Sequence, residues 1–185
     1  MKKPFIFLSA VSLLFILTAC EDHDDDDHKH DESESISKVS LTLIDSTLKD
    51  TIHVFWSDAD GSGGANPILP DTIELKLNGD YLTSITFEGQ VDGHTHDITE
   101  EIKAEGNDHL LCFAPMHLPN VIALEITRLD LDSKGLEIGL KSIWKNRAQI
   151  NGDVQIQLKH QPGIKNGTCD IGETDVELLF PFKNK

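Results

Sequence analysis

The chain has 185 residues and a formal net charge of −16 at pH 7, with 32 acidic side chains against 16 basic ones. A nucleic-acid partner needs a basic surface, so this balance argues against one, and it equally disfavours docking on anionic lipid headgroups. The length suits one domain with a tail.

Residues 1–19 have the features of a bacterial export signal. Two lysines precede a short apolar run at 5–17, which is shorter than the roughly 20 residues that a membrane-spanning helix needs. The run ends in LTAC, which resembles the bacterial lipobox, where the cysteine is lipidated and becomes the mature N-terminus. A leader cleaved without lipidation is the alternative. We expect Cys20 to carry the lipid, which takes the charge of the mature chain to −18 because the leader loses two lysines and no acid.

Residues 20–35 are expected to form a disordered acidic tether after the lipidated cysteine. From 21 to 35 there are nine acidic side chains and no apolar one, so burial cannot offset the entropy of ordering the segment. The tether also contains His23, His28 and His30. Imidazole and carboxylate groups are ligands for zinc and related ions. Two interpretations stay open, a metal-binding tether and a solvated spacer that the export machinery reads.

Alternating apolar and polar residues begin at residue 36 and predict β-strands. About eight segments have this pattern, at 36–44, 51–56, 72–77, 81–87, 109–113, 121–129, 153–160 and 174–182. Clusters of Gly, Asn, Asp and Pro separate them, which is typical of an antiparallel β-sandwich of immunoglobulin-like or jelly-roll-like type over residues 36–185. Asn78-Gly79 predicts a hairpin that joins the third and fourth segments.

One short helix is expected in the middle of the domain, at DITEEIKAEG. Asp97 is placed to cap it, and Glu100 follows three residues later, as in a capping box. Ile98 and Ile102 share one helical face, and Gly106 marks the end.

The segment GHTHDITEE, residues 93–101, is the second candidate metal site. His94 and His96 point the same way if this segment is extended, and His96 approaches Glu100 if the helix begins here. Two imidazoles and a carboxylate suit a divalent ion. In the alternative, the acidic residues only cap the helix and the histidines are exposed loop residues.

Two cysteines, Cys112 and Cys169, remain after Cys20 is used. An exported protein permits a disulfide between them. Two buried free thiols are the alternative, since free cysteine often packs as a small apolar side chain.

Catalytic motifs are absent from the sequence. There is no G-x-S-x-G or H-E-x-x-H, the glycines at 61–64 lack the G-K-[ST] of a phosphate loop, and the Asp-rich stretch 58–64 departs from a calcium loop. We therefore expect a protein that is not an enzyme and has no catalytic residues.

Several segments together resemble a family of small surface or outer-membrane lipoproteins of Bacteroidota: FWSDADGSGG, DITEEIKAEGNDHLLCF, LDLDSKGLEIGL, LKHQPGIKNG and GETDVELLF. The resemblance implies that the acidic stretch 21–27 acts as an export signal to the cell surface. It also implies attachment to the outer membrane and association with TonB-dependent receptors, which import metals and other scarce nutrients.

Together these observations predict a surface-anchored, metal-binding accessory lipoprotein, with zinc as the first candidate ion, that serves TonB-dependent uptake. The alternative is a structural or protein-interaction β-sandwich that holds no metal, such as a receptor accessory or an adhesin. The histidine content of the tether is the feature that separates the two.

Overall fold

The computed structural model describes residues 35–61, 64–91, 94–116, 123–149 and 151–185. All of them belong to one compact unit, Ser33–Lys185. The predicted leader, Cys20 and the tether histidines lie outside the described residues. Within these ranges no helix is long and apolar enough to cross a membrane.

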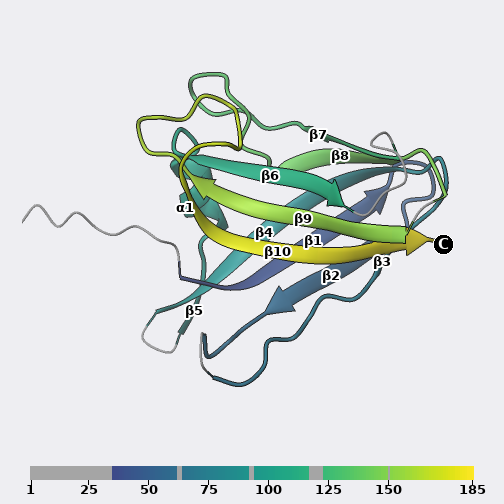
Figure 1. Cartoon of the computed structure of the whole chain (residues 1–185), viewed down its shortest axis with the longest axis horizontal. Coiled ribbons are helices and arrows are strands. Elements are labelled where there is room, and N and C mark those ends of the chain that lie inside the picture. The colour runs from purple at the N-terminus through teal and green to yellow at the C-terminus, as the bar shows by residue number, and fades with distance from the viewer. Residues whose placement is uncertain (1–34, 62–63, 92–93, 117–122, 150) are drawn as a thin grey trace, which may run out of the picture. The chain divides into compact units, whose positions relative to one another are not determined.

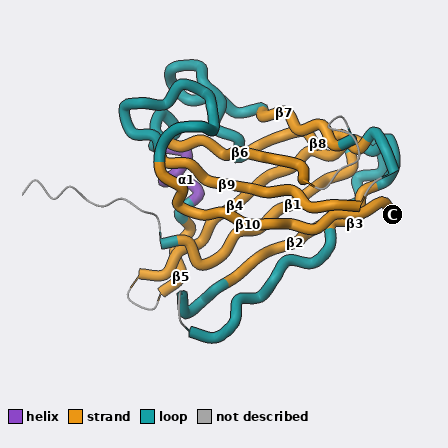
Figure 2. The backbone as a smooth tube through the Cα atoms, in the orientation of Figure 1, coloured by secondary structure: helices purple, strands orange, loops and turns teal. Residues whose placement is uncertain are grey.

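The described residues form ten strands and one short helix, arranged as two sheets (Figures 1 and 2). The first sheet has the order β2 (Thr51–Ser57), β1 (Ile36–Asp45), β4 (Asp80–Val91), β8 (Lys141–Asn146) and β7 (Leu124–Arg128), and β5 (His94–Asp97) also pairs with β4. The second has the order β3 (Ile73–Leu75), β10 (Glu173–Asn184), β9 (Asn151–His160) and β6 (His109–Met116). The helix is α1 (Thr99–Ala104). The predicted all-β antiparallel sandwich with one helix is confirmed.

The core lies between the two sheets because each central strand turns alternate side chains inward. In β1, Val39, Leu41 and Leu43 are fully buried while their neighbours are half-buried. The largest fully buried side chains come from both sheets: Trp144, Tyr81, Phe87, Phe180 and Phe182. Each such side chain stabilises the fold by about 1.5–3 kcal/mol relative to exposure. Figure 1 shows β6, β9 and β10 lying across β1 and β4.

The predicted hairpin at Asn78-Gly79 is wrong, although a turn does form there. Asn78 has a φ of 59°, and the Gly79 N–H donates to the Lys76 carbonyl at 3.0 Å. The strands on its two sides belong to different sheets, since β3 pairs in parallel with β10. The hydroxyl of the buried Tyr81 accepts the Lys76 N–H at 2.7 Å, so the turn carries the chain across the sandwich.

A disulfide joins Cys112 of β6 to Cys169, 57 residues later, with a Cα–Cα distance of 6.0 Å. The structure therefore has the disulfide rather than two buried free thiols. The neighbours of Cys112 along β6, Leu111 and Phe113, contact the core, so Cys112 faces the other side of the sheet. The bridge therefore ties the loop 161–172 to the outer face of β6, where Leu110 is fully buried.

Candidate functional site

β5 presents two histidines to solvent. All four of its residues are exposed, and they pair with the end of β4 at residues 88–91. His94 and His96 are two positions apart on a strand, so their imidazoles leave the same face. They lie opposite Val91 and Gly89, and the Ser35 carbonyl oxygen lies where a side chain on Gly89 would stand.

His96 and Glu100 do not lie at positions i and i+4 of one helix, as the sequence predicted. The helix begins at Thr99, so His96 lies on a strand and the i,i+4 relation to Glu100 does not apply. Asp97 accepts the Thr99 N–H at 2.9 Å, and its hydrogen bonds from the Thr99 side chain and backbone lower the pKa of its carboxyl. Glu100 instead binds Lys103 at 3.1 Å, so the predicted capping box does not form.

Among the described residues, no three His, Cys, Asp or Glu side chains lie close enough together to hold a metal ion. The β5 pair therefore offers two protein ligands from the part of the chain that the structure describes. The other predicted ligands, His23, His28 and His30, fall outside that part.

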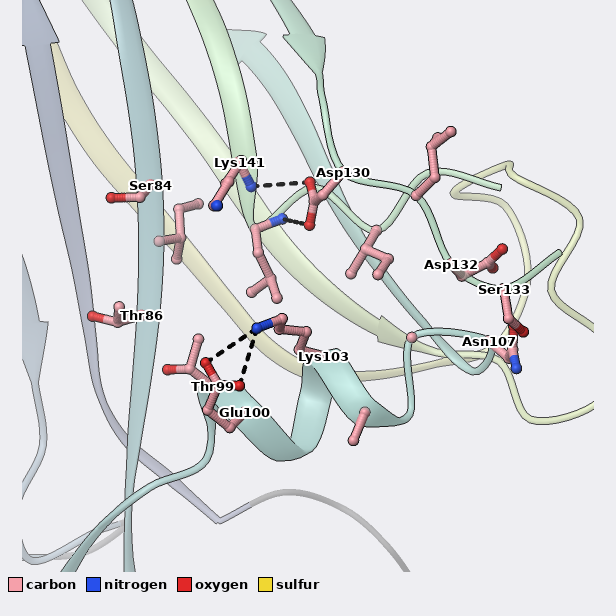
Figure 3. Close-up of a pocket in the computed structure, with 16 residues that line it drawn as sticks. Ser84, Thr86, Thr99, Glu100, Lys103, Asn107, Asp130, Asp132, Ser133 and Lys141 are labelled. Atoms are coloured by element: carbon pink, nitrogen blue, oxygen red, sulfur yellow. Dashed lines mark hydrogen bonds and ion pairs between the residues drawn. The ribbon is translucent and has the colours of Figure 1, made fainter. Parts of the chain in front are cut away.

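A cavity of about 570 Å³ lies where the strands along one edge of β4 are interrupted (Figure 3). β8 pairs with β4 at residues 80–84 and β5 pairs with it at 88–91. Between them, α1 is held against β4 because the Thr99 hydroxyl accepts the Phe87 N–H at 2.9 Å. The cavity walls are β4, α1 and the loop 129–140 with the start of β8.

Two aspartates hold the loop wall in place. Asp130 accepts three backbone N–H groups, from Gly139 at 3.1 Å, Leu140 at 3.1 Å and Lys141 at 3.0 Å. Figure 3 shows two of these bonds beside the cavity. Because each N–H is a fixed donor, the carboxylate sets the backbone conformation at the point where β8 begins.

Asp132 belongs to a buried ion pair with Lys165. The Lys165 ammonium donates to the Asp132 carboxylate at 2.9 Å and to the Gly106 carbonyl at 2.7 Å, and both side chains have 0 % exposure. Burial raises the pKa of Asp132, but the hydrogen bonds from Lys165 and from the Leu136 and Lys134 backbones outweigh it and lower that pKa. The pair links the loop 161–172 to the end of α1 and to the cavity wall.

A second group of buried ionisable side chains lies at the end of the second sheet. The rings of His109 and His160 stack with centroids 4.9 Å apart, and Asp175 Oδ2 lies 4.0 Å from His109 Nε2. His109 is 1 % exposed and the Asp175 side chain 2 %. His109 Nδ1–H donates to the Glu105 carbonyl at 3.3 Å. Neither Asp175 Oδ2 nor His109 Nε2 has a hydrogen-bond partner among the described residues.

Burial shifts both groups toward their neutral forms. It raises the pKa of Asp175 to about 6. The charges of His160 and Lys159 oppose this rise, and the charge of Glu173 adds to it. Burial also lowers the pKa of His109, with a further lowering from His160. The Asp175 contribution to stability is thus complete below its ordinary pKa of 3.8 and is lost as the pH rises through about 6. The His109 contribution has the opposite sign, since it is lost as the pH falls.

We expect Asp175→Asn to raise the free energy of unfolding at pH 8 by about 2–3 kcal/mol, because it removes a buried carboxylate that is charged there. At pH 4 the protonated aspartic acid and asparagine are both neutral, so the gain disappears. Urea unfolding at the two pH values measures the difference. An equal effect at pH 4 and pH 8 would contradict the shifted pKa.

No family model matches the sequence, and neither the search of curated proteins nor the search of solved structures returned a match. The cavity was missed at the sequence level because its walls come from segments far apart in the chain. The segment LDLDSKG, residues 129–135, contains two of the aspartates beside the cavity, but nothing in its sequence indicates which groups their carboxylates bind.

Proposed function

We propose that the protein is a surface-anchored accessory lipoprotein that binds divalent metal ions, zinc first, in support of uptake by a TonB-dependent receptor. The observation that carries this proposal is the pair His94 and His96 on one exposed face of β5. Neutral imidazole is a good ligand for zinc, which takes four ligands in a tetrahedron. A two-imidazole site leaves positions open for water or for the ligands of a receiving protein.

Such a site suits handover better than storage. An ion held by two exposed side chains dissociates readily, because no buried shell holds the imidazoles in place. A protein that supplies a transporter has to release its ion. Copper binds the same ligands more tightly by intrinsic order, so the ligand set alone does not select zinc. The metal available outside the cell then decides which ion occupies the pair.

The proposed lipid anchor and cell-surface location rest on the sequence alone. A lipidated Cys20 would hold the protein on the outer membrane, since each buried methylene of an acyl chain contributes about 0.8 kcal/mol. The acidic stretch 21–27 and the resemblance to Bacteroidota surface lipoproteins support exposure at the cell surface. His23, His28 and His30 would add further weak ligands on the tether.

We expect His94→Ala/His96→Ala to weaken zinc binding by residues 33–185 by about tenfold or more, because both imidazoles are lost, and calorimetric titration measures it. His53→Ala is the matched control. His53 is also an exposed histidine on a strand, but its ring is hydrogen-bonded to Thr42 at 3.0 Å. Equal affinities of wild type and the double variant would remove β5 from the proposal.

A second candidate function is a protein-interaction module without a metal. The specific observation is a row of apolar side chains in register across β1, β4 and β8: Ile44, Leu82 and Ile143. Leu82 is 46 % exposed on the outer face of the sheet. Absence of zinc binding would favour this candidate, and Leu82→Asp would then be the variant to test against a receptor.

A further inference from the structure

We propose that the cavity between β4, α1 and the loop 129–140 binds a small aliphatic carboxylate, with the carboxylate group against the Lys141 ammonium. This inference is independent of the metal-binding proposal, since it uses other residues at another place on the domain. The volume, about 570 Å³, lies within the range typical of small-molecule sites.

The cavity is built from rigid parts, so a ligand would not have to order it. β4 forms one wall with Ser84 to Thr86, and it is paired on its other edge with β1. Asp130 fixes the opposite wall through three backbone N–H groups. The buried Asp132–Lys165 pair fixes the same loop from behind. Preformed walls reduce the entropy that a ligand would lose to loop ordering.

One cation at the cavity is available to an anion, although the chain as a whole is acidic. The three lining carboxylates already have partners: Glu100 binds Lys103, Asp132 binds Lys165, and Asp130 binds backbone N–H groups. By contrast, the structure gives the exposed Lys141 ammonium no ion pair with any described residue. Lys141 is therefore the lining cation that a ligand anion can neutralise without displacing a carboxylate.

The apolar part of the lining is aliphatic. Ile85, Ile138 and Leu140 form the floor, and Leu131, 60 % exposed, stands at the rim. Among the described lining residues there is no aromatic ring, so the stacking that sugars and nucleobases use is missing. Figure 3 shows Lys103 reaching from α1 toward β4, with Lys141 at the start of β8 across the same space. The geometry suits an aliphatic chain that ends in one carboxylate.

Octanoate is the probe for this proposal, titrated into ¹⁵N-labelled residues 33–185 without metal and followed by amide chemical shifts. We expect shifts that saturate and that concentrate on residues 84–86 and 138–141. Lys141→Glu should weaken the affinity by about tenfold or more, since it replaces the attracting charge with a repelling one. Lys145→Glu is the matched control, because it makes the same change on the same face of β8 outside the cavity lining, and it should alter the affinity less than twofold.

Two further ligands separate the components of the proposal. Octan-1-ol has the same chain without the charge and should bind more weakly than octanoate, while inorganic phosphate should not compete with octanoate. Equal binding of octanol, effective competition by phosphate, or shifts scattered away from the cavity would each overturn the assignment. Because zinc is absent throughout, a negative result here leaves the His94–His96 titration unaffected, and the two proposals fail separately.

Discussion

Replacing both Cys112 and Cys169 by alanine is expected to lower the free energy of unfolding by about 4 kcal/mol. The bridge closes a loop of 57 residues, and in the chain-entropy model a cross-link of that length removes about 4 kcal/mol of conformational freedom from the unfolded chain. It also ties the loop 161–172 to the outer face of β6, where Leu110 is fully buried. Urea unfolding of residues 33–185 measures the loss.

A reducing agent supplies the control for this prediction. Reduced wild type should lose nearly as much stability as the double variant, whereas the variant itself should not respond to reductant. A loss below about 1 kcal/mol would contradict the prediction, because the cross-link would then remove little conformational freedom from the unfolded chain. A double variant that responds to reductant as strongly as the wild type would contradict the pairing.

Lys165→Met is expected to cost about 4 kcal/mol of folding free energy, because it leaves the Asp132 carboxylate buried without its counter-charge. Both side chains of the pair are at 0 % exposure, and Lys165 also donates to the Gly106 carbonyl. Lys165→Met/Asp132→Leu should recover part of the loss, since the stranded charge is then removed as well. Urea unfolding of the three proteins gives the comparison.

Lys103→Met is the matched control for the buried pair. Lys103 also pairs with a carboxylate, Glu100, but their side chains are 61 % and 74 % exposed. Exposed pairs contribute about 0–1 kcal/mol, so this variant should remain close to wild type. Similar losses in Lys103→Met and Lys165→Met would contradict the argument from burial.

The strands were predictable where one face of the chain alternates clearly. In β1 the sequence ISKVSLTLI places its apolar residues on one side, and the structure buries that side. The pairing of strands was not predictable from the same pattern. Asn78-Gly79 is a hairpin signal, yet the side chain of Tyr81 and the pairing of β3 with β10 turn it into a crossing between sheets. The residues of a turn do not determine which distant strand the following or preceding segment pairs with.

The candidate sites show the same division between local and tertiary information. GHTHD contains the alternation that places His94 and His96 on one face, but the start of α1 at Thr99 separates them from the helix on which Glu100 lies. Lys103 and Lys141 belong to segments without any common motif, and only the fold brings them to one cavity. The disulfide likewise required geometry, since the sequence supplies two cysteines and no distance.

Calorimetric titration of zinc into residues 33–185, beside the longer form 21–185, tests the central claim most directly. We expect saturable zinc binding by the shorter form, its loss in His94→Ala/His96→Ala, and additional zinc uptake by the longer form. Binding by the longer form alone would place the metal on the tether histidines and remove β5 from the account. Absence of zinc binding by both forms would contradict the proposal that this protein handles metal ions.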